Sequence, residues 1–496
     1  MNLQKENHDV VIVGTGTAGL SAALAAYEKN SEAKLLLIEK APRESRGGNG
    51  RFTGGDLRYC HKGIDEIRGY LPNVSEELLD AVDIPEYTAD DFYTDIMRVT
   101  RGCADREFWE LVIRESNPAI KWLTRLGVVW DIRTERTVKV DGRFVFRHGE
   151  GGIGTKNAGE GLIEGMFEIA ERQGLEVRYD TKAVKLLTDN KGAVNGVKIF
   201  GKDGLKDICC RSVILATGGF SANVEMRTKY LGPKWDLVKV RGSRYNTGEG
   251  LKMAMELGAA PIGQWSGSHN TILDADAPDF GAGMGAARYT FQHSIMVNEN
   301  GQRFVDEGSD FQIYTYAKMG SIVLEQPRGI AFQIFDNKVI HLLREEYANA
   351  VPIKADTLEE LAKKTDIDPE NLVKTVTEFN KAVQPGEFNP VIRDGKGTKG
   401  ITPPKSNWAR KIDTPPYTAY AITTGITFSF GGLKVDKDAR ILNSEGKPIQ
   451  NLYATGEMVG GSFYYNYAMG SGITKNVVLG RIAGYNAASF GKEITS

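Results

Sequence analysis

Three glycines near the start of the chain have the spacing of a phosphate-binding turn. Gly14, Gly16 and Gly19 form a G-x-G-x-x-G motif. In such a motif the first glycine allows a tight turn, the second lets the backbone approach a pyrophosphate, and the third lets a helix pack on a strand. Glu39 follows about 20 residues after the last glycine, where a carboxylate accepts hydrogen bonds from ribose hydroxyls and repels a 2′-phosphate. The pattern predicts a dinucleotide site that disfavours NADP.

The elements around this motif are those that a dinucleotide fold needs. Residues 9–13 are an apolar run typical of a buried parallel strand, the Ala-rich stretch after Gly19 predicts a helix, and residues 34–38 predict a second strand. The N-terminus of that helix carries the partial positive charge that attracts phosphates. Two later apolar strands end in similar Thr-Gly turns, at residues 216–218 and 454–456. The sequence therefore predicts a discontinuous Rossmann-like α/β domain, because these turns lie far apart along the chain.

The length and the order of these elements suggest three segments. The chain has 496 residues and a mass of 54.5 kDa. We expect residues 1–264 and 421–496 to form the two parts of the nucleotide domain, and residues 265–420 to form an inserted α+β capping domain that carries the substrate. Pro-rich turns at 402–404 and 414–416 lie near the end of the insertion and fit either a hinge or plain loops.

The composition excludes several classes of protein. The chain has 62 basic and 64 acidic residues, a net charge of −2, which argues against nucleic-acid binding. No apolar run approaches the ~18 residues of a membrane span, no signal peptide is visible, and we expect a cytoplasmic protein. The four cysteines form no C-x-x-C pair, which argues against an iron–sulfur cluster, and no grouping has the spacing of metal ligands.

Taken together, the motifs resemble those of the flavoprotein family of fumarate reductases, succinate dehydrogenases, 3-oxosteroid dehydrogenases and L-aspartate oxidase. Beyond the first turn and Glu39, the resemblance lies in residues 46–49, 216–220, 246–250, 297–307 and 454–457. It implies FAD, a capping domain, and hydride exchange at flavin N5 that makes or removes a C=C bond next to an activating carbonyl or carboxylate. The implied cofactor-binding residues are Gly14, Gly16, Thr17, Ala18, Gly19, Glu39, Lys40, Arg46, Gly47, Gly48, Asn49, Ala183, Ala216, Thr217, Gly218, Gly456, Glu457, Gly472 and Ile473.

Within this family, the FAD-dependent tricarballylate dehydrogenases are the most similar subfamily, through segments such as 241–244, 303–311 and 425–433. The stretch 48–53 contains no His like the one that members with covalent flavin present there, so the resemblance implies non-covalent FAD. Ile340 stands where fumarate reductases have an Arg that delivers a proton, and Tyr467 stands where they have an Arg that binds a carboxylate. The His of their His-x-Met-Gly-Gly-like strand is replaced within residues 427–430. These departures argue against fumarate as the substrate.

Three residues are the predicted catalytic groups. Removing a hydride and a proton from adjacent carbons needs a base and cationic groups that stabilise the developing negative charge. We assign the base to Tyr467, which as a phenol needs a neighbouring cation to act at neutral pH. Arg288 would bind a substrate carboxylate, and His269 would act as a donor or acid. Arg58 and Arg244 are weaker candidates.

The sequence leaves three functions open. The first is a tricarballylate-type dehydrogenase or reductase acting on a carboxylate, with a separate electron-transfer protein as a partner. The second is an oxosteroid or enone dehydrogenase, with Phe428 and Phe430 lining an apolar cavity. The third is a flavin-binding protein without turnover. A capping pocket with two or more convergent Arg side chains would favour the first.

Overall fold

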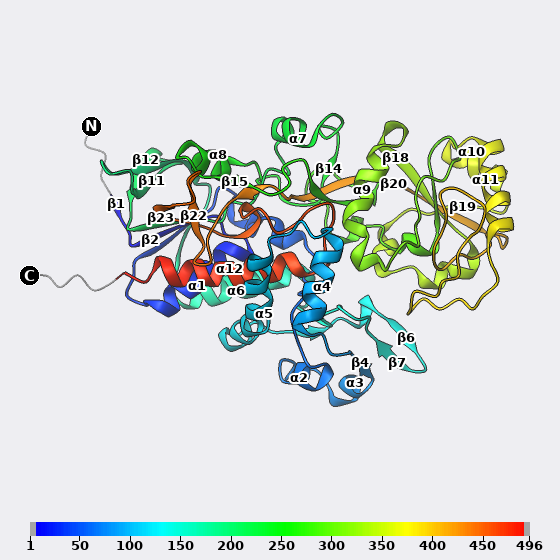
Figure 1. The fold of residues 1–496 in the computed structure, drawn as a ribbon, viewed down its shortest axis with the longest axis horizontal. Helices are drawn as coiled ribbons and strands as arrows, with labels where there is room; N and C mark the ends of the chain where they lie inside the picture. Colours follow the sequence, from blue (N-terminus) through cyan, green and yellow to red (C-terminus); the bar gives the residue numbers. More distant parts are fainter. Residues whose placement is uncertain (1–5, 491–496) are drawn as a thin grey trace, which may run out of the picture.

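The computed structural model describes residues 6–490, with Val138 described by its backbone alone. The ribbon has three parts: a nucleotide domain that contains the first and the last described elements, a capping domain on the opposite side, and a smaller helical lobe beside them (Figure 1). No helix among the described residues is both long and apolar enough to cross a membrane.

The nucleotide domain is built on a six-stranded sheet. Its strands, in spatial order, are β22 (Arg440–Leu442), β23 (Pro448–Ala454), β13 (Ser212–Leu215), β2 (Val10–Val13), β3 (Leu35–Ile38) and β9 (Glu176–Arg178). All neighbours pair in parallel except β22 and β23. Every residue of β2, β3 and β13 is buried, which explains their uninterrupted apolar sequences. Because β23 pairs with β13, residues from both ends of the chain share one sheet.

The two faces of this sheet are covered by different layers. Val10 and Ile12 pack in the cluster of α1 (Thr17–Lys29), α6 (Ala158–Arg172) and α12 (Ser471–Ala487), whereas Val11 and Val13 pack in the cluster of a second sheet. That sheet has the order β1 (Glu6–Asn7), β12 (Gly204–Cys209), β11 (Val194–Gly201) and β10 (Lys182–Thr188). Helix α12 crosses α1 so closely that a Cβ on Gly484 would lie 2.0 Å from the Ala22 oxygen. A Cβ on Gly480 would likewise lie 2.5 Å from the Ala18 oxygen, so the middle of α12 lies beside the start of α1.

The capping domain has a sheet around one long strand. Strand β20 (Tyr417–Ser429) pairs with β14 (Lys239–Val240), β16 (Ser268–Asp274), β18 (Ile330–Phe335) and β19 (Ile353–Ala355), and β18 also pairs with β17 (Ile295–Val297). The helices of this domain are α9 (Tyr316–Leu324), α10 (Leu358–Thr365) and α11 (Pro369–Ala382). The boundary expected at 420 falls inside β20, whose last residues reach back to the nucleotide domain.

A helical lobe, which the sequence did not separate from the nucleotide domain, lies between β3 and α6 in the chain (Figure 1). Its elements are α2 (Ile64–Arg68), α3 (Glu76–Asp80), β4 (Val82–Asp83), α4 (Ala89–Val99), α5 (Arg106–Leu126), β5 (Asp131–Ile132), β6 (Val138–Val140), β7 (Arg143–Val145) and β8 (Ile153–Gly154). The remaining helices and strands are α7 (Val224–Leu231), α8 (Glu249–Glu256), β15 (Pro261–Ile262) and β21 (Gly432–Leu433).

Candidate active site and cofactor cavity

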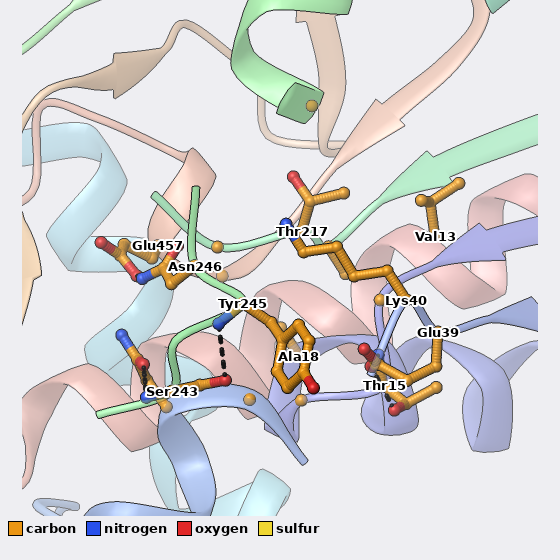
Figure 2. A pocket seen from close by; sticks show the side chains of 18 of the residues that line it. Val13, Thr15, Ala18, Glu39, Lys40, Thr217, Ser243, Tyr245, Asn246 and Glu457 are labelled. Atoms are coloured by element: carbon orange, nitrogen blue, oxygen red, sulfur yellow. Dashed lines mark hydrogen bonds between the residues drawn. The ribbon is translucent and has the colours of Figure 1, made fainter. Parts of the chain in front are cut away.

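An elongated cavity runs over the carboxyl ends of β2, β3 and β13, and we call it the nucleotide cavity. Glu39 and Lys40 lie at one end, and Asn246 with Glu457 at the other (Figure 2). The structure brings most of the predicted cofactor residues to its wall: Gly14, Gly16, Thr17, Ala18, Glu39, Lys40, Gly48, Asn49, Ala183, Ala216, Thr217, Gly218, Gly456 and Glu457. They come from segments up to about 440 residues apart, as the predicted discontinuous domain requires.

The first glycine turn has the shape and the free donors that a pyrophosphate needs. Gly14 has φ of +101°, and a Cβ there would lie 2.4 Å from the Ala216 oxygen. Gly16, by contrast, faces open space, since a Cβ would meet only the Gly47 oxygen at 3.5 Å. It is the N-cap of α1 and supplies no side-chain cap, and the buried Thr17 hydroxyl has no hydrogen-bond partner. An anion at this helix start would satisfy these groups.

At the far end, Glu39 is held in place by the backbone. Its Oε2 accepts hydrogen bonds from the Thr15 N–H (3.1 Å) and hydroxyl (2.7 Å), and its Oε1 accepts one from the Ala41 N–H (2.9 Å). Lys40 pairs with Glu249 (2.9 Å) and also donates to Thr247. A carboxylate anchored in this way can bind ribose hydroxyls with its remaining lone pairs.

A second cavity, the inner cavity, continues from the first, because Thr17, Asn49, Gly50, Glu457 and Asn476 line both. Its other lining residues are Thr53, Gly54, Asp56, Arg136, Arg241, His269, Met284, Tyr289, Tyr316, Thr427, Phe428, Phe463, Tyr467, Met469, Gly470, Gly472, Ile473 and Lys475. Predicted residues His269, Tyr467, Gly472 and Ile473 are therefore brought together here. They come from β16, from the loop before α12 and from the start of α12.

Tyr467 and His269 lie in contact within an aromatic wall. Their ring centroids are 4.9 Å apart, and Phe428 packs against both. The Tyr467 hydroxyl accepts a hydrogen bond from the Gly472 N–H (3.0 Å), so its own proton remains free for another acceptor. Burial raises the pKa of Tyr467 above its usual value, and burial holds the pKa of His269 well below its usual range. At neutral pH the first is a protonated phenol and the second an uncharged imidazole.

Two buried guanidinium groups face the same cavity. Arg136 is 9% exposed and Arg241 is 5% exposed, and the Nε of each has no hydrogen-bond partner. The carboxylates of Asp56 and Glu135 approach Arg136 only to 3.9 Å. Arg241 donates only weakly, to the Phe52 oxygen at 3.4 Å and to the Met284 sulfur. Because buried cations normally spend their donors on anions, this site has the electrostatics of a carboxylate pocket.

Comparison with known proteins identifies the family of this chain. A family profile described as "FAD binding domain" matches residues 9–473. The chain belongs to this FAD-binding family. It is 30% identical over 97% of its length to a probable fumarate reductase of Shewanella frigidimarina, covering 75% of that protein. It is 29% identical over 97% of its length to a urocanate reductase of Eggerthella lenta, covering 74% of that protein.

Solved structures agree with this assignment. The open conformation of a flavocytochrome c3 fumarate reductase matches with a TM-score of 0.74 and 28% identity, over 97% of this chain and 78% of that one. The predicted fumarate reductase-type fold and the predicted cofactor are thus confirmed. The protein is an FAD-dependent oxidoreductase of the fumarate reductase family that acts on C=C bonds. The residues of the nucleotide cavity fit FAD: Gly16 and the start of α1 would hold its phosphates, and Glu39 would bind its ribose.

Four residues of the predicted cofactor-binding and catalytic sets line neither cavity, and neither do the weaker candidates Arg58 and Arg244, nor Phe430. Gly19 packs under the turn, where a Cβ would lie 1.9 Å from the Gly14 oxygen, and Gly47 packs against Ile163. Arg46 stacks on Phe167 and donates to Glu164, Glu171 and the Tyr179 hydroxyl. These three shape the floor of the FAD site instead of facing it.

The fourth, Arg288, is a correction to the predicted catalytic set. It pairs with Asp274 (Nη2 to Oδ2, 2.6 Å), and its Nη1 donates to the carbonyl oxygens of Gly285, Ala287 and Glu346. All its nitrogens are used in tying loops of the capping domain together, so none is left for a substrate. The arginines that do face the inner cavity are Arg241 and Arg136.

The sequence did not predict that these two arginines and Asp56 line the inner cavity. Arg241 does stand in the segment 241–244 that resembles tricarballylate dehydrogenases, and the next residues contact the flavin loop, since the Ser243 N–H donates to Asn49 Oδ1 (2.9 Å). That resemblance was the available signal. Arg136 lies in a polar stretch, Thr-Glu-Arg-Thr, whose pattern is that of any surface loop. Only the fold brings it to the cavity.

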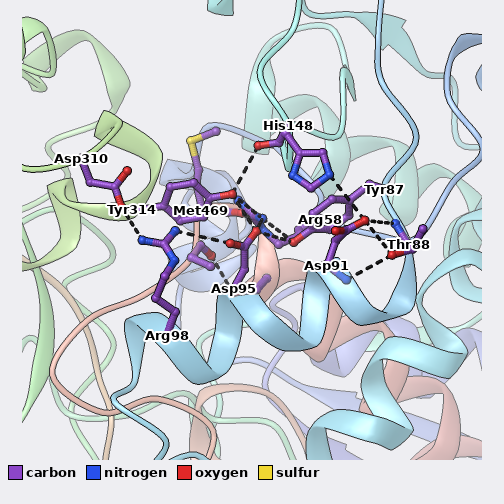
Figure 3. A network of polar contacts seen from close by, with 12 residues as sticks. Arg58, Tyr87, Thr88, Asp91, Asp95, Arg98, His148, Asp310, Tyr314 and Met469 are labelled. Carbon is purple, nitrogen blue, oxygen red and sulfur yellow. Dashed lines mark hydrogen bonds and ion pairs between the residues drawn. The ribbon is translucent and has the colours of Figure 1, made fainter. Parts of the chain in front are cut away.

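A buried polar network behind the inner cavity fixes the Tyr467 loop (Figure 3). The fully buried Arg58 donates from Nε to the Met469 oxygen (2.8 Å) and from Nη1 to Asp95 (3.0 Å) and the Tyr87 hydroxyl (2.7 Å). Tyr314 also donates to Asp95 (2.7 Å). Arg58 is thus a clamp between α4 and the turn that precedes α12, two residues after Tyr467.

Proposed function

We propose that this enzyme interconverts a saturated polycarboxylic acid and its α,β-unsaturated counterpart, of the tricarballylate and aconitate type. The observation that supports this most is the pair of buried arginines, Arg136 and Arg241, which face one cavity with unspent donors. A substrate with at least two carboxylates would neutralise both. A separate electron-transfer protein would complete the catalytic cycle.

The residues divide the chemistry between binding and proton transfer. When bound, FAD supplies hydride exchange at its N5 position. Arg136 and Arg241 would bind the substrate carboxylates through charge-assisted hydrogen bonds, and they would stabilise the enolate-like charge that develops on the activating carboxylate. The rings of Phe428, Phe463 and Tyr316 exclude water around them.

Tyr467 would hold the proton that is exchanged with the second carbon. Since its phenol is protonated at neutral pH, it can donate a proton directly when a C=C bond is reduced. In the opposite direction the hydroxyl must first lose its proton, and the Gly472 N–H at the start of α12 would stabilise the resulting phenolate. His269 would stay neutral and orient Tyr467 by ring contact.

The aromatic wall supports a second candidate, a neutral enone or 3-oxosteroid. Phe428, Phe463, Tyr316 and Tyr289 offer apolar surface to such a substrate, and Tyr467 could then donate to its ketone. This candidate offers no substrate carboxylate to Arg136 or Arg241. For that reason we rank it below the polycarboxylate.

The two candidates separate in an anaerobic flavin experiment. Tricarballylate should bleach the oxidised flavin, or aconitate should reoxidise the dithionite-reduced flavin, with a 3-oxosteroid having no effect. Replacing Arg241→Gln should lower the second-order rate constant by about thirtyfold or more, the effect expected for breaking a buried charged pair. Arg244→Gln, three residues further and exposed, is the matched control and should react normally. Reaction with the steroid alone, or an unaffected Arg241→Gln variant, would refute the proposal.

A further inference from the structure

A polar cleft lies outside the inner cavity and adjoins it. This outer cleft has a volume of about 810 Å³ and lies between the β6–β7 hairpin of the lobe and the capping-domain segments around His341 and Phe388. Hairpin and capping domain stand on the same side of the molecule in Figure 1. Two residues, Arg136 and Tyr289, line both the outer cleft and the inner cavity. A molecule in the cleft is therefore next to the substrate site.

The outer cleft carries an excess of positive charge. Five basic side chains line it, against three acidic ones: Arg136, Lys139, Arg147, Arg344 and Arg410 against Glu135, Asp141 and Glu345. Carboxylates behind the wall pair with two of the cations, Glu150 with Arg147 (3.3 Å) and Glu346 with Arg344 (3.4 Å), so the positive charge of the cleft is carried mainly by Arg410 and Lys139. Arg410 forms no ion pair with any residue between 6 and 490, and its guanidinium lies over the Phe388 ring, 4.8 Å from the centroid. Arg410 also lines a neighbouring groove with Lys338, Lys396 and Lys411, so the positive surface extends outward.

Several donors in the cleft are buried without partners. Gln312 is 2% exposed and Arg147 is 9% exposed. Neither Gln312 Nε2 nor Arg147 Nε has a hydrogen-bond partner among the described residues. At the junction, the Tyr289 hydroxyl and Arg136 Nε are unpartnered too. Burial, together with the charges of Lys405, Arg147 and Arg410, holds the pKa of His293 in this cleft well below its usual range. A buried surface with unspent donors and positive potential is complementary to an anion.

We propose that the outer cleft is an anion-docking site, where a small polycarboxylate binds before it passes between Arg136 and Tyr289 into the inner cavity. This inference rests on the proposed function, because it takes its ligand class from the carboxylate assigned to the inner cavity. The basic side chains of the cleft raise the rate at which anions reach the active site. Apart from Arg136, which also faces the inner cavity, they take no part in the chemical step.

The test uses the FAD-loaded, dithionite-reduced enzyme and its reoxidation by aconitate in stopped flow. At low aconitate concentration the rate of flavin reoxidation depends on how fast aconitate binds, and at saturating aconitate it depends on the chemical step. Arg410→Gln should lower the low-concentration rate constant by about fivefold at low ionic strength, and leave the saturated rate unchanged. Added salt should remove the difference, since the Debye length falls to ~3 Å at 1 M. Glu345→Gln, which removes a negative charge from the cleft, should have the opposite effect.

The controls separate docking from general electrostatics and from the proposed function. Lys411→Gln removes the same charge from the next residue, which lines the neighbouring groove and not the outer cleft, and should change the rate constant less than twofold. Uncharged trimethyl aconitate should react equally with all variants. Equal effects of Arg410→Gln and Lys411→Gln, or a wild-type rate for both Arg410→Gln and Glu345→Gln, would overturn the docking site while leaving the function intact. No reoxidation of wild type by aconitate would remove both proposals.

Discussion

The nucleotide cavity and the inner cavity meet at Glu457, yet they are built by different means. The first is defined by backbone: glycines that permit close approach, a helix N-terminus, and a carboxylate held by peptide N–H groups. The second is defined by side chains from separate places in the chain, among them Asp56, Arg136, Arg241, His269 and Tyr467. The difference shows that each piece of the nucleotide cavity is encoded by a short local motif, whereas the inner cavity depends on how the three parts of the molecule assemble.

Gly16 gives the sharpest way to break the first cavity alone. A Cβ at this position meets no atom closer than 3.5 Å, so Gly16→Ala should leave the protein folded but occupy the space for the pyrophosphate. We expect FAD affinity to fall by about a hundredfold or more, roughly 3 kcal/mol, with loss of all activity. Flavin absorbance after gel filtration and circular dichroism measure the two properties. Gly165→Ala, where a Cβ meets nothing within 4 Å, is the control and should bind FAD normally. Full retention of FAD by Gly16→Ala would contradict the assignment.

Tyr467 tests the inner cavity in the opposite way. Tyr467→Phe keeps the ring contacts with His269 and Phe428 but removes the hydroxyl, so FAD should remain bound while the flavin reacts about 10²–10⁴-fold more slowly with substrate. Tyr465→Phe, in the same loop and 47% exposed, should react at the wild-type rate. Stopped-flow flavin absorbance gives both rates. A Tyr467→Phe enzyme with normal rates would leave Tyr467 as a packing residue.

The first cavity could be predicted from the sequence because each part of it is a short motif. The strand–turn–helix at 10–29, the acid at 39 and the Thr-Gly turns are recognisable without the fold, and fourteen predicted residues line the cavity. The parallel order of β23 and β13 follows from the same pattern. Arg46 was misplaced for a local reason: it flanks a glycine turn, but its side chain satisfies Glu164 and Glu171 on α6.

The substrate site could be predicted only in part. Tyr467 and His269 stood out by residue type beside a glycine turn and a strand, and both line the inner cavity. Arg288 was chosen because it is a cation in an apolar stretch, yet the nearby Asp274 neutralises it. No sequence pattern tells a cation that is paired inside the fold from one that is not. Arg136 shows the converse, since the lobe that carries it has no motif and its position depends on long-range packing.

The direction of catalysis should depend on pH because Tyr467 changes its role with direction. Its raised pKa keeps the phenol protonated through the neutral range, so reduction of a C=C bond should show no loss of rate from Tyr467 between about pH 6 and 9. Oxidation of the saturated acid needs the phenolate, and its rate should rise by about tenfold per pH unit over the same range. The rates of flavin reduction by the saturated acid and of flavin reoxidation by the unsaturated acid, each in a single turnover, measure the two pH dependences. An oxidation rate that is flat with pH would mean that another group takes the proton.

The smallest expected effect is on the pH dependence of the free energy of unfolding. It concerns the inner cavity, whose wall contains His269, whereas no histidine lines the nucleotide cavity among the described residues. His269 has a folded-state pKa well below the reference value of 6.5, so below that pH the unfolded chain binds a proton that the folded protein does not. Stability is therefore present above pH 6.5 and falls as the pH drops, by about 1.4 kcal/mol per unit for one such group. Replacing His269→Asn should shrink the fall in Tm between pH 6.5 and 5.5 by about 1–2 °C, measured by scanning fluorimetry. A fall in Tm that is equal in the His269→Asn variant and in wild type would show that the imidazole is protonated in the folded enzyme.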